Sequence, residues 1–287
     1  MKQLRQIIND IKALSPESTN KLENLLWPYI CYSPKMPLRL AQEQLLQSAE
    51  TLSLTVNDEY FAGKELRFNT FKWGNGKRKL LLTHGWGSKA IDFSELITAL
   101  AENEDLEIIA FDAPGNGSSE GELSNLLLFK QAVKAIVSHY GTPDVVIGHS
   151  LGAMANIIAL REMRITPSLL ISMAPLVRLK EKFEASMDVL NIPQVSQTAF
   201  LESFNTKFGV PACHFILENW YEFDVQLNHW VIYDSNDAIS PYSYLKEFLD
   251  NHQFIKAKNY EGTGHDKIIK SPIIIADLVE ILNSALN

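Results

Sequence analysis

The pentapeptide Gly148-His-Ser-Leu-Gly152 holds a serine in the pattern G-x-S-x-G. The apolar run Val145-Val-Ile147 before it is typical of a strand, and Leu151–Ile158 after it is typical of a helix. A serine on such a tight strand-to-helix turn projects its hydroxyl above the sheet, where it can attack a carbonyl carbon. The pattern and its context therefore predict that Ser150 is a nucleophile in acyl transfer.

A second match to the same pattern, Gly117-Ser-Ser-Glu-Gly121, lies in a stretch rich in Gly, Ser and Glu that follows Pro114. No strand-like run leads into this match, so nothing would hold its serine in the required turn. We therefore predict that Ser119 is not a nucleophile.

A serine hydroxyl is a poor nucleophile without a base that removes its proton and an acid that orients the base. His265 ends the segment Glu261-Gly-Thr-Gly-His265, whose glycines let a flexible loop fold back over the carboxyl edge of the sheet. His139, His229 and His252 each precede a strand, which places them at the opposite edge. His265 is the predicted general base.

The acid is expected at the end of the strand that contains Val231, where Asp234 and Asp237 both occur. Asp237 lies in the turn, from which it can reach the His265 loop. Asp234 is expected to shape that turn by accepting local backbone N–H bonds. The sequence therefore favours Asp237 as the acid.

The oxyanion of the reaction requires hydrogen-bond donors, which the segment His84-Gly-Trp-Gly-Ser88 offers at the end of another predicted strand. The backbone N–H groups of Trp86 and Leu151 are the predicted donors. His84 is expected to brace this loop.

Short apolar runs alternate with segments of helical length after residue 78, which is typical of a doubly wound parallel sheet. Residues 52–56 and 65–71 alternate apolar with polar side chains, as edge strands do. The parallel strands are expected at 79–83, 106–111, 144–148, 168–173, 230–234 and 253–260, with helices at 91–101, 123–140, 151–163 and 272–286.

The remaining segments predict three parts: an N-terminal helical extension (1–50), a core (51–175 and 227–287) and a helical cap (176–226) inserted between the sixth and seventh strands. The aromatic residues of the cap indicate either an apolar acyl pocket or plain packing; they are Phe183, Phe200, Phe204, Phe208, Phe215, Trp220 and Tyr221. The N-terminal helices are expected to cover a sheet edge or to contact a second subunit.

The chain has 287 residues, and its net charge of −8 gives no general attraction to phosphate backbones or anionic lipid. Nucleic acid and membrane partners are therefore not expected. Cys31 and Cys213 are expected to be buried free thiols. The first twelve residues lack the apolar stretch of a signal peptide, which predicts a cytoplasmic protein.

Together these motifs resemble the α/β-hydrolase superfamily over residues 79–270. The matching segments are His84-Gly-Trp-Gly87, Phe111-Asp-Ala-Pro-Gly115, Gly148-His-Ser-Leu-Gly152, Asp234-x-x-Asp237 and Gly264-His265. The resemblance implies a mostly parallel eight-stranded sheet, Ser150, Asp237 and His265 as triad, Trp86 and Leu151 as oxyanion residues, and neither metal nor organic cofactor. Asn116 stands where many relatives have histidine, with no expected effect on the triad.

These features predict a serine hydrolase that cleaves small carboxylic esters or thioesters through an acyl-enzyme. Alternatives are C–C bond hydrolysis, a lyase or a perhydrolase reaction on the same triad, and a non-catalytic binding protein on a hydrolase fold. Ser150 argues against dehalogenases and epoxide hydrolases, whose nucleophile is an aspartate. The sequence leaves the oligomeric state open.

Overall fold

The structure is a computed structural model, and it describes residues 2–14, 19–223 and 226–286. Within these residues an eight-stranded sheet has the order β1-β2-β4-β3-β5-β6-β7-β8. The strands are β1 Glu50–Asp58, β2 Lys64–Trp73, β3 Arg78–Thr83, β4 Leu106–Phe111, β5 Val145–His149, β6 Leu169–Met173, β7 His229–Tyr233 and β8 Lys256–Asn259.

The pairing confirms a mostly parallel sheet, because all neighbours from β4 to β8 run in the same direction. β1 and β2 pair antiparallel, and β2 also pairs antiparallel with β4. The prediction that residues 65–71 form an edge strand is therefore wrong, since β2 has a neighbour on each side. The edges are β1 and β8, and every residue of β8 is exposed.

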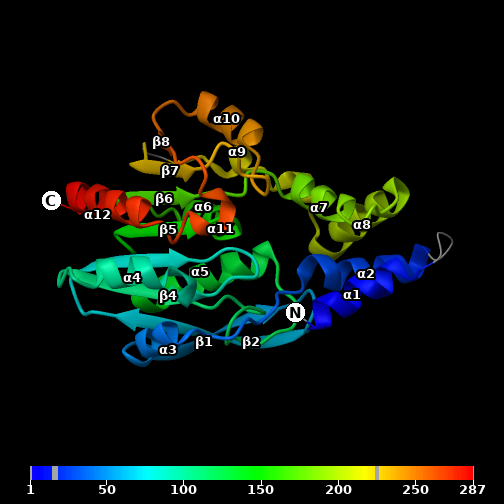
Figure 1. Ribbon diagram of the computed structural model, residues 1–287, viewed down its shortest axis with the longest axis horizontal. Coiled ribbons are helices and arrows are strands. Elements are labelled where there is room, and N and C mark those ends of the chain that lie inside the picture. The colour runs from blue at the N-terminus through cyan, green and yellow to red at the C-terminus, as the bar shows by residue number, and fades with distance from the viewer. Residues whose placement is uncertain (1, 15–18, 224–225, 287) are drawn as a thin grey trace.

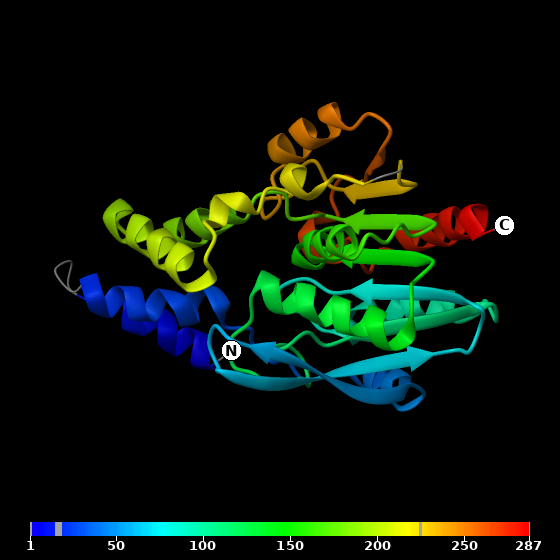
Figure 2. The ribbon, with the colours of Figure 1, turned by 180° about the vertical axis from the view of Figure 1, so that it is seen from behind.

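Helices cover both faces of the sheet, as the uniformly apolar strands predict. Successive strand residues alternate between two cores: Leu80 and Leu82 belong to one, and Leu81 to the other. α4 (Ser94–Leu100) and α12 (Pro272–Leu286) cover the first face, which is nearer the viewer in Figure 1. α5 (Leu126–Tyr140) and α6 (Leu151–Met163) cover the second face, seen in Figure 2.

The other helices lie before, between and after the strands, largely where the sequence predicts them. They are α1 Lys2–Lys12, α2 Thr19–Cys31, α3 Leu40–Gln47, α7 Leu179–Asp188, α8 Gln194–Phe208, α9 Leu217–Trp220, α10 Tyr242–Asn251 and α11 Gly264–Lys267, with short 3₁₀ turns η1 Ala90–Phe93 and η2 Ala212–His214. The expected helix at 91–101 is divided between η1 and α4.

The cap leaves and rejoins the core at one narrow place, where Arg178 and Ile216 form an antiparallel bridge. The N–H of Leu217 bonds to the carbonyl of Val177 at 2.8 Å, and the N–H of Leu179 bonds to that of Phe215 at 3.0 Å. α7 and α8 lie in the sequence between these two paired segments. In space they lie beyond the carboxyl ends of the parallel β-strands (Figure 1). We propose that the cap is the part from Arg178 to Ile216, and that α9 belongs to the core.

The N-terminal helices α1 and α2 lie at the same end of the molecule as α7 and α8 (Figures 1 and 2). Trp27 of α2 packs against Phe200, Phe204 and Phe208 of α8, with ring centroids 4.8, 6.2 and 5.9 Å apart. The hydroxyl of Tyr29 donates a hydrogen bond to the carbonyl of Ser186 in α7 at 2.7 Å. α2 therefore packs on the cap, and α1 packs against α2. α3 instead packs on the core through Gln42, which donates to the carbonyl of Ile91.

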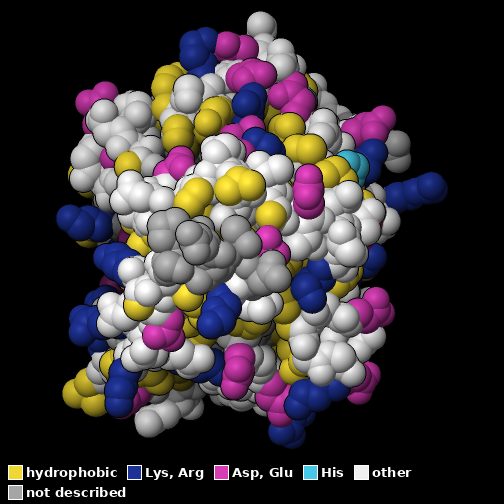
Figure 3. Space-filling view, turned by 90° about the vertical axis from the view of Figure 1, so that its right-hand side faces the viewer, with side chains coloured by type: hydrophobic (Ala, Val, Ile, Leu, Met, Phe, Trp, Pro, Cys, Tyr) yellow, Lys and Arg dark blue, Asp and Glu magenta, His cyan; other side chains and the backbone are white. Residues whose placement is uncertain are grey.

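The surface at this end mixes hydrophobic side chains with charges of both signs (Figure 3). Both cysteines are free, but only Cys31 is buried; Cys213 is exposed, which corrects the expectation of two buried thiols. Across the ranges that the structure describes, no helix has the length and apolar character needed to cross a bilayer.

Candidate active site

Ser150 occupies the turn between β5 and α6, with φ 51° and ψ −119°. Few residues other than glycine adopt a positive φ, so the fold around this serine must stabilise a strained backbone. The neighbouring glycines permit the turn because a Cβ on Gly148 would lie 2.6 Å from Ala153 Cα, and one on Gly152 would lie 2.3 Å from the carbonyl oxygen of His84.

The structure brings Ser150, His265 and Asp237 into one hydrogen-bonded chain. Ser150 Oγ lies 2.8 Å from His265 Nε2, and His265 Nδ1 lies 2.7 Å from Asp237 Oδ2. Both partners are shielded from water, with side chains 8% exposed for His265 and 2% exposed for Asp237. The distances are those of a nucleophile, a base and an orienting acid.

Hydrogen bonds favour the ionised form of the Asp237 carboxyl. Burial alone raises the pKa of the Asp237 carboxyl, but His265 and the backbone N–H groups of Ile239 and Ser240 outweigh it, so the pKa is lowered. Those N–H groups donate to Asp237 Oδ1 at 2.7 and 3.1 Å. An ionised Asp237 must accept its bond from Nδ1–H of His265. That tautomer leaves Nε2 free to accept the proton of the Ser150 hydroxyl.

Asp234 also accepts backbone N–H bonds, and one of them reaches further than the sequence predicts. Its Oδ1 accepts from the N–H of Asn236 at 2.9 Å, within the turn, and its Oδ2 accepts from the N–H of Gly264 at 2.7 Å. The second bond fixes the segment that carries His265. That segment is the short helix α11, which corrects the expectation of a flexible glycine-rich loop.

Trp86 and Leu151, the two predicted oxyanion residues, line the same cavity as Ser150. Among the described residues, neither backbone N–H has a hydrogen-bond acceptor, so both are free to bind an oxyanion. His84 is fully buried, and its Nε2 accepts from the N–H of Ala113 at 3.0 Å. Its Nδ1 therefore carries the hydrogen and donates to the carbonyl of Gly85 at 2.6 Å, which braces the loop before Trp86.

His149 contacts His265, which the sequence alone did not indicate. Its Nε2 lies 3.0 Å from the backbone carbonyl of His265, to which only an N–H can donate. Burial and the nearby His265 lower the pKa of His149 to about 3, so the ring is neutral. A neutral ring adds no positive charge next to the imidazole of His265 while it bonds to the backbone of that residue.

The alternative serine, Ser119, lies in the loop after β4, where hydrogen bonds hold its hydroxyl. Its hydroxyl donates to the carbonyl of Asp112 at 2.6 Å and accepts from the N–H of Asn69 at 2.9 Å. The amide of Asn116 is bound nearby to Pro114 O and Ser124 Oγ. Neither Ser119 nor Asn116 has a hydrogen bond to a candidate triad residue among those described.

A cavity of about 250 Å³ opens above Ser150, and its walls come from three parts of the chain. Trp86, Ser150 and Leu151 belong to the core. α7 supplies Leu179, Lys182, Phe183 and Ser186, and the N-terminal segment supplies Leu4, Tyr29, Ile30, Tyr32 and Pro34. The sequence left open whether the N-terminal helices cover a sheet edge or contact a subunit; in the structure they form a wall of this cavity.

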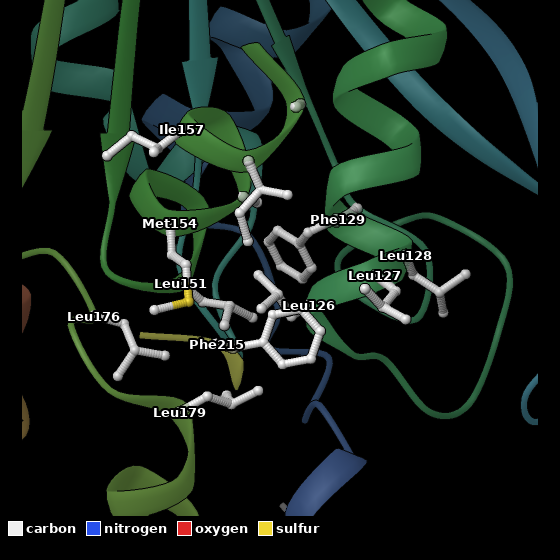
Figure 4. Packing of buried hydrophobic residues seen from close by; sticks show 14 of the residues in the cluster. Leu126, Leu127, Leu128, Phe129, Leu151, Met154, Ile157, Leu176, Leu179 and Phe215 are labelled. Carbon is white, nitrogen blue, oxygen red and sulfur yellow. The ribbon is translucent and has the colours of Figure 1, made fainter. Parts of the chain in front are cut away.

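The aromatic side chains of the cap divide between the two roles left open by the sequence. Phe183 alone among them lines the cavity, as far as the described residues go. Phe200, Phe204, Phe208 and Phe215 are buried within the core cluster. Figure 4 shows Phe215 and Leu179 packed near Leu126 and Leu151, where the base of the cap meets α5 and α6.

In the described ranges, no group of three or more His, Cys, Asp or Glu side chains could hold a metal ion. The polar side chains near Ser150 include the imidazole of His265, which is bonded to its hydroxyl, and Tyr29, Tyr32, Lys182 and Ser186, which line the same cavity.

The chain is similar to known proteins in both sequence and fold. The model of the "Alpha/beta hydrolase family" matches residues 80–265. The monoglyceride lipase of Rattus norvegicus is 28% identical over 125 residues, which are 41% of this chain and 41% of the lipase. The chain thus matches about two fifths of the length of that curated relative.

Solved structures show the likeness in fold. An esterase from Pyrococcus furiosus has a TM-score of 0.62 at 18% identity, covering 90% of this chain and 98% of the esterase. A thermophilic esterase from Thermogutta terrifontis has a TM-score of 0.57 at 16% identity, covering 82% of this chain and 99% of that one.

Proposed function

The chain belongs to the alpha/beta hydrolase family, and from that membership we propose that it is a serine hydrolase that cleaves carboxylic esters or thioesters. The observation that carries the proposal is the hydrogen-bonded chain Ser150–His265–Asp237 on a strained turn beside two free backbone N–H groups. The similarity to a monoglyceride lipase supports an ester as the substrate.

The first half of the reaction forms an acyl-enzyme. Ser150 Oγ attacks the carbonyl carbon of the ester while Nε2 of His265 takes the hydroxyl proton. Asp237 stabilises the resulting imidazolium through Nδ1–H. The oxyanion of the tetrahedral intermediate accepts hydrogen bonds from the N–H groups of Trp86 and Leu151, and the positive end of α6 adds to this stabilisation.

The second half releases the acid. Nε2–H of His265 gives its proton to the departing alcohol or thiol, which leaves the acyl group on Ser150. Water then takes the place of the alcohol: His265 removes its proton as it attacks the acyl carbon, and the proton returns to Ser150 as the acid departs. Each step uses side chains, backbone N–H groups and water.

The same triad can serve other reactions, and rates on different substrates distinguish them from ester hydrolysis. C–C hydrolysis, a lyase reaction or a perhydrolase reaction would each be faster on its own substrate than on a simple ester. A binding protein on this fold would have no turnover. The complete, hydrogen-bonded triad favours an enzyme over the binding protein.

We expect the purified protein to hydrolyse p-nitrophenyl butyrate with an initial burst of p-nitrophenol where deacylation is the slower step. The palmitate ester should be a poorer substrate, because a cavity of about 250 Å³ is smaller than the roughly 300–1,000 Å³ of most ligand pockets. Absorbance of p-nitrophenol measures both rates, and Ser150→Ala protein from the same purification controls for contaminating esterases. Folded protein that hydrolyses neither short-chain esters nor thioesters would contradict the proposal.

A further inference from the structure

Lys182 of α7 lines the cavity that holds Ser150. Leu179, Lys182, Phe183 and Ser186 follow the helical spacing of one face, and all of them line the cavity. The side chain of Lys182 is only partly exposed. Burial lowers the pKa of its ammonium, and the negative charge of Asp237 acts in the opposite direction.

The other cations at the start of α7 have carboxylate partners, whereas the described residues offer none to Lys182. Lys180 bonds to both carboxylate oxygens of Glu184 at 2.7 Å. Arg178 forms an ion pair with Glu247. No hydrogen-bond acceptor or ion-pair partner of Lys182 Nζ occurs among the described residues. Removing an ammonium from water without a hydrogen-bonding or ion-pair partner costs free energy, and a bound anion would offset that cost.

The ammonium of Lys182 stands out because the rest of the cavity lining carries little charge. The lining of this cavity is mainly apolar, from residues such as Leu4, Ile30, Leu176 and Phe183, and no carboxylate side chain lines it within the described ranges. A cation in an apolar cavity attracts an anion more strongly than one in water does. Because the whole chain carries a net charge of −8, only a local cation of this kind favours an anionic ligand.

We propose that Lys182 selects substrates in which an apolar ester or thioester carries an anionic group, such as a carboxylate, within reach of its ammonium. The inference rests on the proposed function, since it names the substrate class of the same site. Lys182 forms a charge-assisted hydrogen bond with the anion while the apolar walls hold the remaining carbon chain. Ser150 then attacks the ester carbonyl.

Two pairs of matched esters test the proposal. p-Nitrophenyl hexanoate and mono-p-nitrophenyl adipate share a six-carbon acyl chain, and only the adipate ends in a carboxylate. The butyrate esters of 4-hydroxybenzamide and 4-hydroxybenzoate place the same contrast on the alcohol. kcat/KM is measured for all four with wild type, Lys182→Met, Lys182→Gln and Lys182→Arg, and with Lys180→Met as the control on the same helix.

We expect Lys182→Met and Lys182→Gln to lower kcat/KM for the anionic member of at least one pair about tenfold to hundredfold more than for its neutral partner. Lys182→Arg should keep the preference, and Lys180→Met should change both members alike. The pair that responds shows whether the anion lies on the acyl or the alcohol side.

Equal losses on both members of both pairs would mean that Lys182 acts on the triad or the fold, and would overturn the inference. No loss on any ester would overturn it as well, because the ammonium would then only face solvent. In both outcomes the neutral esters are still hydrolysed by wild type, so the proposed function stands. Wild-type protein that hydrolyses none of the four esters overturns the proposed function and this inference together.

Discussion

Replacing Ser150 with alanine should reduce ester hydrolysis by about 10⁵-fold to 10⁶-fold while the protein stays folded. In the proposed reaction Oγ of Ser150 bonds to the acyl carbon, and its hydroxyl proton passes to His265 Nε2, which lies 2.8 Å away. Without it, only water attack supported by the oxyanion donors remains. Steady-state kinetics with p-nitrophenyl butyrate measures the loss, and circular dichroism checks the fold.

Ser119→Ala is the matched control, because it removes the serine of the second G-x-S-x-G pattern. Ser119 bonds to Asp112 and Asn69 in a loop away from the triad, so its loss should lower stability by about 1–3 kcal/mol and leave turnover nearly unchanged. A folded Ser119→Ala protein without activity, beside an active Ser150→Ala protein, would show that the nucleophile has been assigned to the wrong serine.

Asp237→Asn should lower kcat by about 10⁴-fold with little change in melting temperature. Asparagine can keep the bonds of Oδ1 to the N–H groups of Ile239 and Ser240. Its amide would, however, donate to Nδ1 of His265, and the imidazole would then carry its hydrogen on Nε2. A protonated Nε2 cannot accept the proton of Ser150, so the base is lost although the geometry remains.

Asp234→Asn is the control that separates the two acids of this turn. Only one oxygen of asparagine can accept, so the bond to either Asn236 or Gly264 is lost, at a cost of about 1.5–3 kcal/mol of stability. Turnover should fall far less than in Asp237→Asn, because the acid next to Nδ1 remains. If Asp234→Asn loses the 10⁴-fold and Asp237→Asn does not, Asp234 is the triad acid.

The sequence predicts the sheet well because its strands are short apolar runs between segments of clear helical period. The run Leu106–Phe111 and the helices Leu151–Met163 and Pro272–Leu286 have the same bounds in the structure. The placement of residues 65–71 at an edge was wrong because alternation reports one exposed face, not the number of neighbours. Glycines at 262 and 264 suggested a loop at His265, whereas local bonds to Asp234 support a short helix there.

The meeting of Ser150, Asp237 and His265 in one hydrogen-bonded group could be predicted because each residue follows a strand that ends at the same edge. Their catalytic roles stay predictions. The walls of the cavity could not be predicted. The apolar spacing of Leu4, Ile7, Ile8 and Ile11 indicates a helix with a buried face, but not that Leu4 borders Ser150. The sequence does not single out Lys182 either, because it does not show that Glu184 bonds to Lys180 and Glu247 to Arg178, which leaves Lys182 Nζ without an acceptor among the described residues.

The central claim is that Ser150 is an activated nucleophile, and labelling with a fluorophosphonate tests it most directly. The probe forms a covalent phosphonyl bond only with a serine whose proton is removed by a base. Intact-protein mass spectrometry should show one adduct per chain in wild type, peptide mapping should place it on Ser150, and Ser150→Ala should remain unlabelled while Ser119→Ala labels as wild type does. A folded wild-type protein without an adduct, or an adduct that persists in Ser150→Ala, would contradict the account.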